Sequence, residues 1–187
     1  MWEYNYTQDN NELYHYGVPG MKWGHRKAIR LENKVSRKYR KAGKFLGKSD
    51  YYKSEGDRIY KSHDSAAKAF EKQAKVYESQ GHMLKAEVAR RSATAIRNRG
   101  SNIKAGNLAK AERYAQKAEK SKEKASEFAT KKRVDIGKKK IDSILSESRK
   151  KSFESTARTE SALKDKQIRD KYGDNTLNAY KNIQGKS

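Results

Sequence analysis

Apolar side chains recur every three or four residues along most of the chain, a spacing that places them on one face of an α-helix. The clearest run lies between residues 57 and 80, and its members are Ile59, His63, Ala66, Phe70, Ala74 and Tyr77. A second run, between residues 108 and 129, follows the spacing of a coiled-coil seam with alanine where leucine is usual. Alanine allows close approach but buries little apolar area. The pattern therefore predicts thin helices packed through narrow seams.

Glycines and polar clusters divide this pattern into segments. The fold class predicted is all-α, an elongated antiparallel helical bundle with an extended aromatic N-terminal arm. The segments, in chain order, are a basic helix at 25–47, a loop at 48–56, a helix at 57–80 ending at Gly81, a helix at 82–98 ending at Gly100, the alanine-rich run, and one or two helices at 134–172. The candidate breaks in the last segment are Gly137 and the stretch 152–161, and Gly173 is the expected C-cap before a short terminal helix carrying Leu177 and Tyr180.

The composition limits the size of the hydrophobic core. Leu, Ile, Val and Phe make up about 14% of the residues, and the net charge is +22. Such a chain has little apolar surface to bury. It has no cysteine, which excludes disulfides and thiolate chemistry. No apolar run reaches the ~18 residues of a membrane span, and the N-terminus lacks the features of a secretory signal. We therefore expect synthesis in a bacterial cytoplasm and no membrane span.

Residues 1–24 differ in composition from the rest of the chain. Three acids outweigh a single lysine in this segment, so the whole positive net charge lies downstream. The segment also contains both tryptophans and several tyrosines. Val18-Pro19-Gly20 is typical of a type II turn, because proline sets φ at the second position and glycine supplies positive φ at the third. We therefore divide the chain into an aromatic arm, 1–24, and a basic helical body, 25–187.

Residues 15–27 read HYGVPGMKWGHRK. This stretch resembles the HYGVxGMKWGxR signature of proteins from tailed-phage and prophage structural gene clusters, where it accompanies head, portal-proximal and other virion-associated proteins. The matching residues are His15, Tyr16, Gly17, Val18, Gly20, Met21, Lys22, Trp23, Gly24 and Arg26. The resemblance implies a virion protein whose partners are phage structural proteins of the capsid or portal region. The candidate docking residues of the arm are Tyr16, Val18, Pro19, Met21 and Trp23.

The basic residues of the body are clustered. Ten Lys and Arg between residues 25 and 48 accompany one acid, Glu32, and nine between 131 and 151 accompany three acids. Charge of this density attracts polyanions, and no base-reading motif is visible, so we predict sequence-independent contact with nucleic acid. The candidate residues are Arg26, Lys27, Arg30, Arg37, Lys38, Arg40, Lys41, Lys138, Lys139 and Lys140. The alternative interpretation is a solvated lysine-rich surface that binds nothing. Anchoring on anionic lipid is disfavoured by the sparse apolar face of the basic helix.

Catalytic motifs are absent from the sequence. There is no nucleophile elbow, Walker loop, dinucleotide-binding turn or HExxH pattern. Nine residues separate His15 from His25, with Glu12 as the nearby carboxylate, and this matches no zinc-binding spacing. We therefore predict a protein that is not an enzyme and that uses no cofactor or metal.

These observations favour a non-enzymatic phage virion protein, head-associated or internal. It would dock through its N-terminal signature and contact DNA or an acidic capsid lining through its basic body. Two alternatives stay open. One is a host-directed effector delivered by the phage, with the signature as a packaging tag, and the other is a non-specific DNA-binding protein unrelated to virions. Self-association into a homo-oligomer is open in each case.

Overall fold

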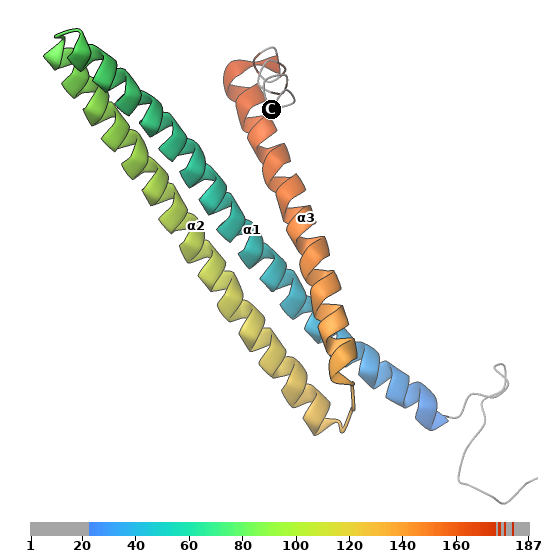
Figure 1. The fold of residues 1–187 in the computed structure, drawn as a ribbon. Coiled ribbons are helices and arrows are strands. Elements are labelled where there is room, and N and C mark those ends of the chain that lie inside the picture. Colours follow the sequence, from blue (N-terminus) through green and yellow to red (C-terminus); the bar gives the residue numbers. More distant parts are fainter. Residues whose placement is uncertain (1–22, 175, 177, 179–180, 182–187) are drawn as a thin grey trace, which may run out of the picture.

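Three long α-helices form the part of the chain that the computed structural model describes, which is residues 23–174 together with 176, 178 and 181 (Figure 1). Helix α1 spans Trp23–Ser79, α2 spans Met83–Lys131 and α3 spans Lys138–Tyr172. The all-α prediction is confirmed. Helices α1 and α2 form an antiparallel hairpin, and α3 packs beside the first half of α1 before diverging from the hairpin (Figure 1). Helix α1 is therefore the central element, because it packs against both others.

The interface between α1 and α2 is a seam of small side chains. The buried residues repeat every seven positions, with one eleven-residue step in each helix, and they are Val35, Ala42, Ser49, Gly56, Ala67 and Ala74 on α1 and Ala86, Ala93, Gly100, Ala111, Ala118 and Ala125 on α2. Ser49 Oγ donates to the Ala111 carbonyl at 2.8 Å, which fixes the antiparallel register. A seven-residue period is the coiled-coil repeat, and a four-residue insertion shifts it without breaking the helix.

Glycine contributes to this seam through its missing side chain. A Cβ placed on Gly100 would lie 2.7 Å from the Cβ of His63, and one placed on Gly56 would lie 3.2 Å from the Cβ of Asn107. The two helices can therefore approach closely only because these positions are glycine. The cost of glycine in a helix, about 1 kcal/mol relative to alanine, is offset by the contacts that this approach allows.

Several predicted helix ends and breaks are wrong. The expected loop at 48–56 lies inside α1, the expected end at Gly100 lies inside α2, and the candidate break at 152–161 lies inside α3. The break at Gly81 is confirmed, with φ of 77°, and Gly173 is the C-cap of α3, with φ of 82°. Residue 137 precedes α3 as expected. The terminal helix expected around Leu177 and Tyr180 lies outside the described residues.

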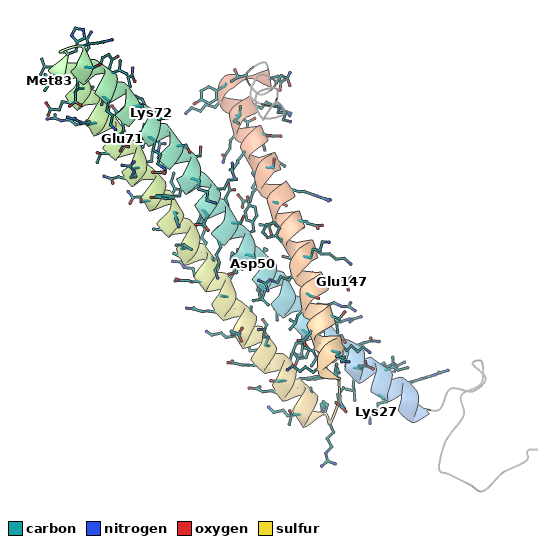
Figure 2. All side chains as sticks on the ribbon, viewed as in Figure 1. Lys27, Asp50, Glu71, Lys72, Met83 and Glu147 are labelled. Carbon is teal, nitrogen blue, oxygen red and sulfur yellow. The ribbon has the colours of Figure 1, made fainter. Side chains whose placement is uncertain are left out.

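Helix α3 lies parallel to α1, and a row of polar contacts accompanies the apolar packing between them. Ser148 Oγ and Ser152 Oγ donate to the carbonyls of Arg40 and Lys44, each at 2.7 Å. These contacts sit beside Gly43 and Gly47, where added Cβ atoms would approach Ser148 and Ser152 to 2.8 Å. The flanking ion pairs are Glu32–Lys140, Asp50–Arg149 and Glu55–Lys164. Figure 2 shows Asp50 and Glu147 on the stretch where α1 and α3 run side by side.

The apolar core is concentrated near the α2–α3 connection. Val35, Tyr39, Ala125 and Ile136 are buried there, and Ile141, Ile144 and Leu145 of α3 pack against them. The predicted seam at 59–77 is covered only in part, since Ala74 is buried while Phe70 remains 36% exposed. Among the described residues, no helix combines the length and the apolar character needed to cross a bilayer.

Candidate polyanion interface

One face of α1 carries an unbroken row of cations. Their positions alternate in steps of three and four residues, and we name this row the basic stripe: Lys27, Arg30, Lys34, Arg37, Lys41, Lys44 and Lys48. Alternating steps of three and four keep side chains on one face of a helix. At a rise of 1.5 Å per residue the stripe is about 32 Å long. Six of its members are exposed and Lys48 is half-buried. The label on Lys27 marks its start, at the projecting N-terminal end of α1 (Figure 2).

The cations of the basic stripe have no carboxylate partners within the described part of the chain. Basic residues beside it do have such partners, as Arg149 has in Asp50 and Lys140 has in Glu32. Like charges three or four residues apart destabilise a helix by a few tenths of a kcal/mol per pair. The stripe is therefore a region of concentrated positive potential that α1 itself does not neutralise, and an external anion would relieve the repulsion.

The second half of the basic stripe lines a groove between α1 and α3. The groove has a volume of about 710 Å³, and its walls are Arg37, Lys41, Lys44, Phe45 and Lys48 from α1 and Lys151, Ser152, Ser155 and Thr156 from α3. Five of these nine side chains are cations and three bear hydroxyls. Lys151 is paired with Glu147, and the hydroxyls of Ser152 and Thr156 already donate to backbone carbonyls. The four cations of α1 and the Ser155 hydroxyl are the donors that this lining offers to a phosphate-like group. Because α3 forms the second wall, its docking on α1 is needed to build the groove.

Aromatic rings form a short row next to this groove, which we name the aromatic row. Tyr114 of α2 stacks on Tyr52 at 5.7 Å between ring centroids and on Phe45 at 6.4 Å. Three lysine nitrogens lie over these rings at 5.3–5.5 Å, and they belong to Lys48, Lys110 and Lys117. Cations over ring faces are favourable by about 0.5–1 kcal/mol at exposed sites. The groove therefore combines positive charge with aromatic surface.

The Tyr52 hydroxyl ties the aromatic row to α3. It donates to Glu160 Oε1 at 3.0 Å. Burial, together with the hydrogen bond to the Glu160 carboxylate, raises the pKa of Tyr52 to about 12. The hydroxyl therefore stays protonated at neutral pH and keeps this link between α1 and α3.

The structure unites some of the predicted polyanion-binding residues and separates others. Lys27, Arg30, Arg37 and Lys41 share the basic stripe. The remaining residues lie elsewhere: Arg26 and Arg40 fall outside the spacing of the stripe, Lys38 lies over the ring of Phe128, Lys140 pairs with Glu32, and Lys138 and Lys139 are exposed in the first turn of α3. Cations in a first turn oppose the helix dipole and gain least from their own helix.

Sequence reasoning did not select several cations of the basic stripe, the groove and the aromatic row. Lys34, Lys44 and Lys48 lie in the basic run of α1 but were not among the predicted contacts, and the three-four spacing of cations is the signal that identifies them. Lys110, Lys117 and Lys151 come from other helices, and no local pattern points to them.

The predicted docking residues of the arm are not tested. Four of them lie outside the described residues: Tyr16, Val18, Pro19 and Met21. The fifth, Trp23, is the first residue of α1, and only its backbone belongs to the described part of the chain. In the described ranges, no group of three or more histidine and carboxylate side chains is placed to hold a metal ion.

Comparison with known proteins yields one match. A family of unknown function, DUF7211, matches residues 7–29. This range includes all of HYGVPGMKWGHRK and the first turns of α1. Neither the curated proteins nor the solved structures give a match. The matched family thus covers the signature segment, and most of the helical body lies outside it.

Proposed function

We propose that the protein binds polyanions without catalysis and that the basic stripe contacts nucleic-acid phosphates independently of sequence. The observation that supports the proposal most strongly is the row of seven cations on one face of α1, with no carboxylate partner among the described residues. Neutralising phosphates releases condensed counterions, which drives binding at low salt. If all seven cations contacted phosphates, the logarithm of the binding constant would fall with the logarithm of salt concentration with a slope of about −6.

The biological setting in this proposal is a phage virion. Its support is the resemblance of HYGVPGMKWGHRK to the signature of tailed-phage structural gene clusters. In this setting the aromatic arm docks on a capsid or portal-region protein, and the basic body contacts DNA or an acidic lining. DNA is the better ligand of the two because its dense phosphate charge releases condensed counterions when a row of cations neutralises it.

A pair of matched triple variants tests the proposal. The stripe variant is Lys34→Gln, Lys41→Gln and Lys44→Gln, and the control is Lys120→Gln, Lys124→Gln and Lys131→Gln on the exposed side of α2. All six lysines are exposed and lack carboxylate partners within the described residues. Both variants lose three charges, so their net charges stay equal. Binding of the full chain to random-sequence duplex DNA is measured by fluorescence anisotropy.

The stripe variant is expected to bind about 500-fold more weakly at about 0.1 M salt, because each of the three lost phosphate contacts removes about 0.9 logarithmic unit. The control is expected to lose far less. Equal losses in the two variants would show that only the overall charge matters and would refute a defined interface.

A further inference from the structure

We infer that the groove between α1 and α3 is a binding site for single-stranded polynucleotide, with phosphates on the basic stripe and a base stacked on Phe45. This inference rests on the proposed function and specifies which form of nucleic acid the groove accepts. It is carried by two features that lie side by side, the cations of the groove and the end of the aromatic row.

The surroundings of α1 disfavour a duplex at this position. The major groove of B-DNA is about 12 Å wide and admits one α-helix. Along residues 35–56, α1 has α2 packed on one side and α3 on another, so it cannot enter that groove alone. A duplex could reach this segment only by laying its backbone over the outside of the groove. A single strand has one backbone and unpaired bases, so it can place phosphates and a base in the groove together.

The ring of Phe45 offers a stacking surface that an unpaired base can use and a base-paired duplex cannot. Its ring lines the groove and is only half-buried, and it stands at the end of the row Phe45–Tyr114–Tyr52. An unpaired base stacked on Phe45 would extend this row by one ring. The bases of a duplex are already stacked on one another and present only their edges.

The position of the cations is consistent with a strand that places its phosphates on the basic stripe and one base on Phe45. Lys48 is both the last member of the basic stripe and a neighbour of the aromatic row, with its nitrogen 5.5 Å from the Tyr114 ring centroid. Lys44 and Lys41 precede it by about one and two turns on the same face. On the opposite wall, the Ser155 hydroxyl has no hydrogen-bond partner within the described ranges and can donate to a phosphate or a base. Charge and ring surface therefore converge on one groove.

The test compares single-stranded and duplex DNA with equal numbers of phosphates, using the full chain and two variants. Phe45→Leu removes the ring, and Phe45→Tyr retains it. Stacking of a base on an aromatic side chain is worth about 1–3 kcal/mol, which corresponds to a factor of at least about five in affinity. We expect Phe45→Leu to weaken single-strand binding by at least that factor and to leave duplex binding unchanged. Phe45→Tyr is expected to retain the preference for single strands. Far-UV circular dichroism confirms that both variants are folded.

The outcomes separate this inference from the proposed function. If Phe45→Leu binds single strands as tightly as the wild type, or if duplex is bound more tightly than single strands, the single-strand site is refuted while polyanion binding stands. If neither form of DNA binds at low salt, both proposals fail. If Phe45→Leu weakens both forms equally, the ring supports the groove rather than a base, and the inference is again overturned.

Discussion

Replacing Gly47 with alanine should detach α3 from α1, although alanine is the better helix former. In the structure, a Cβ on Gly47 would lie 2.8 Å from Ser152 Cβ and 2.9 Å from the Phe153 nitrogen, and it would also press against the Arg149 carbonyl. Two of these three atoms belong to the backbone of α3, so they cannot rotate away. Helix α3 would therefore have to move as a unit.

The change in the free energy of unfolding is the balance of opposing contributions. Alanine in place of glycine stabilises an exposed helix position by about 1 kcal/mol. Overpacking costs about 1–3 kcal/mol, and loss of the hydrogen bonds from Ser148 and Ser152 costs about 1 kcal/mol each. We expect Gly47→Ala to lower the free energy of unfolding by about 2–4 kcal/mol in total. Gly106→Ala is the matched control, because Gly106 lies in α2 with nothing within 4 Å of an added Cβ.

Urea unfolding followed by far-UV circular dichroism measures both variants against the wild type. Gly106→Ala should raise the midpoint and Gly47→Ala should lower it. Because the groove needs α3 as its second wall, Gly47→Ala should also weaken DNA binding. If Gly47→Ala stabilises the protein as much as Gly106→Ala does, α3 does not pack on α1 at this position, and the groove described here does not exist.

Three further predictions concern the helix contacts. Ala118→Leu, at a position with no exposed surface, should destabilise the hairpin by about 1–3 kcal/mol in thermal unfolding, whereas Ala109→Leu at an exposed position should be nearly neutral. Hydrogen bonds from Arg58 and then Lys164 lower the pKa of Glu55 from 4.5 to about 2. A lowered folded-state pKa gives stability that is present above pH 4.5 and lost as the pH falls toward 2, so acid unfolding of Glu55→Gln should be less steep in that range. Ultraviolet titration should show a tyrosine ionising near pH 12, and Glu160→Gln should lower that value.

The helical class of the fold could be predicted from the sequence because the three-four spacing of apolar residues is a local property. The positions of the helix ends could not be predicted as well. Gly100 and the segment around Gly56 have the composition of breaks, and their helical state depends on partner residues such as His63 and Asn107 on the facing helix. Gly81 adopts a positive φ of 77° between α1 and α2 and breaks the helix, whereas Gly106 stays helical inside α2 although it too has nothing within 4 Å of an added Cβ.

One part of the candidate interface was likewise predictable from the sequence, and another part was not. A dense basic segment on α1 is visible in composition alone, and the three-four spacing within it marks the face. The second wall of the groove was not predictable, because Lys151 and Ser155 reach it only through the parallel docking of α3. The stacking of Tyr114 between Phe45 and Tyr52 likewise depends on the register of α2 against α1, which a single sequence does not specify.

The most direct test of the basic stripe is the salt dependence of DNA binding by the full chain and by the Lys34→Gln, Lys41→Gln, Lys44→Gln variant. The account predicts a steep linear fall of log affinity with log salt for the wild type. The slope for the variant should be shallower by about three units, one for each lost phosphate contact, with no dependence on DNA sequence in either case. A slope near zero for the wild type, or the same slope for both proteins, would contradict phosphate binding by the basic stripe.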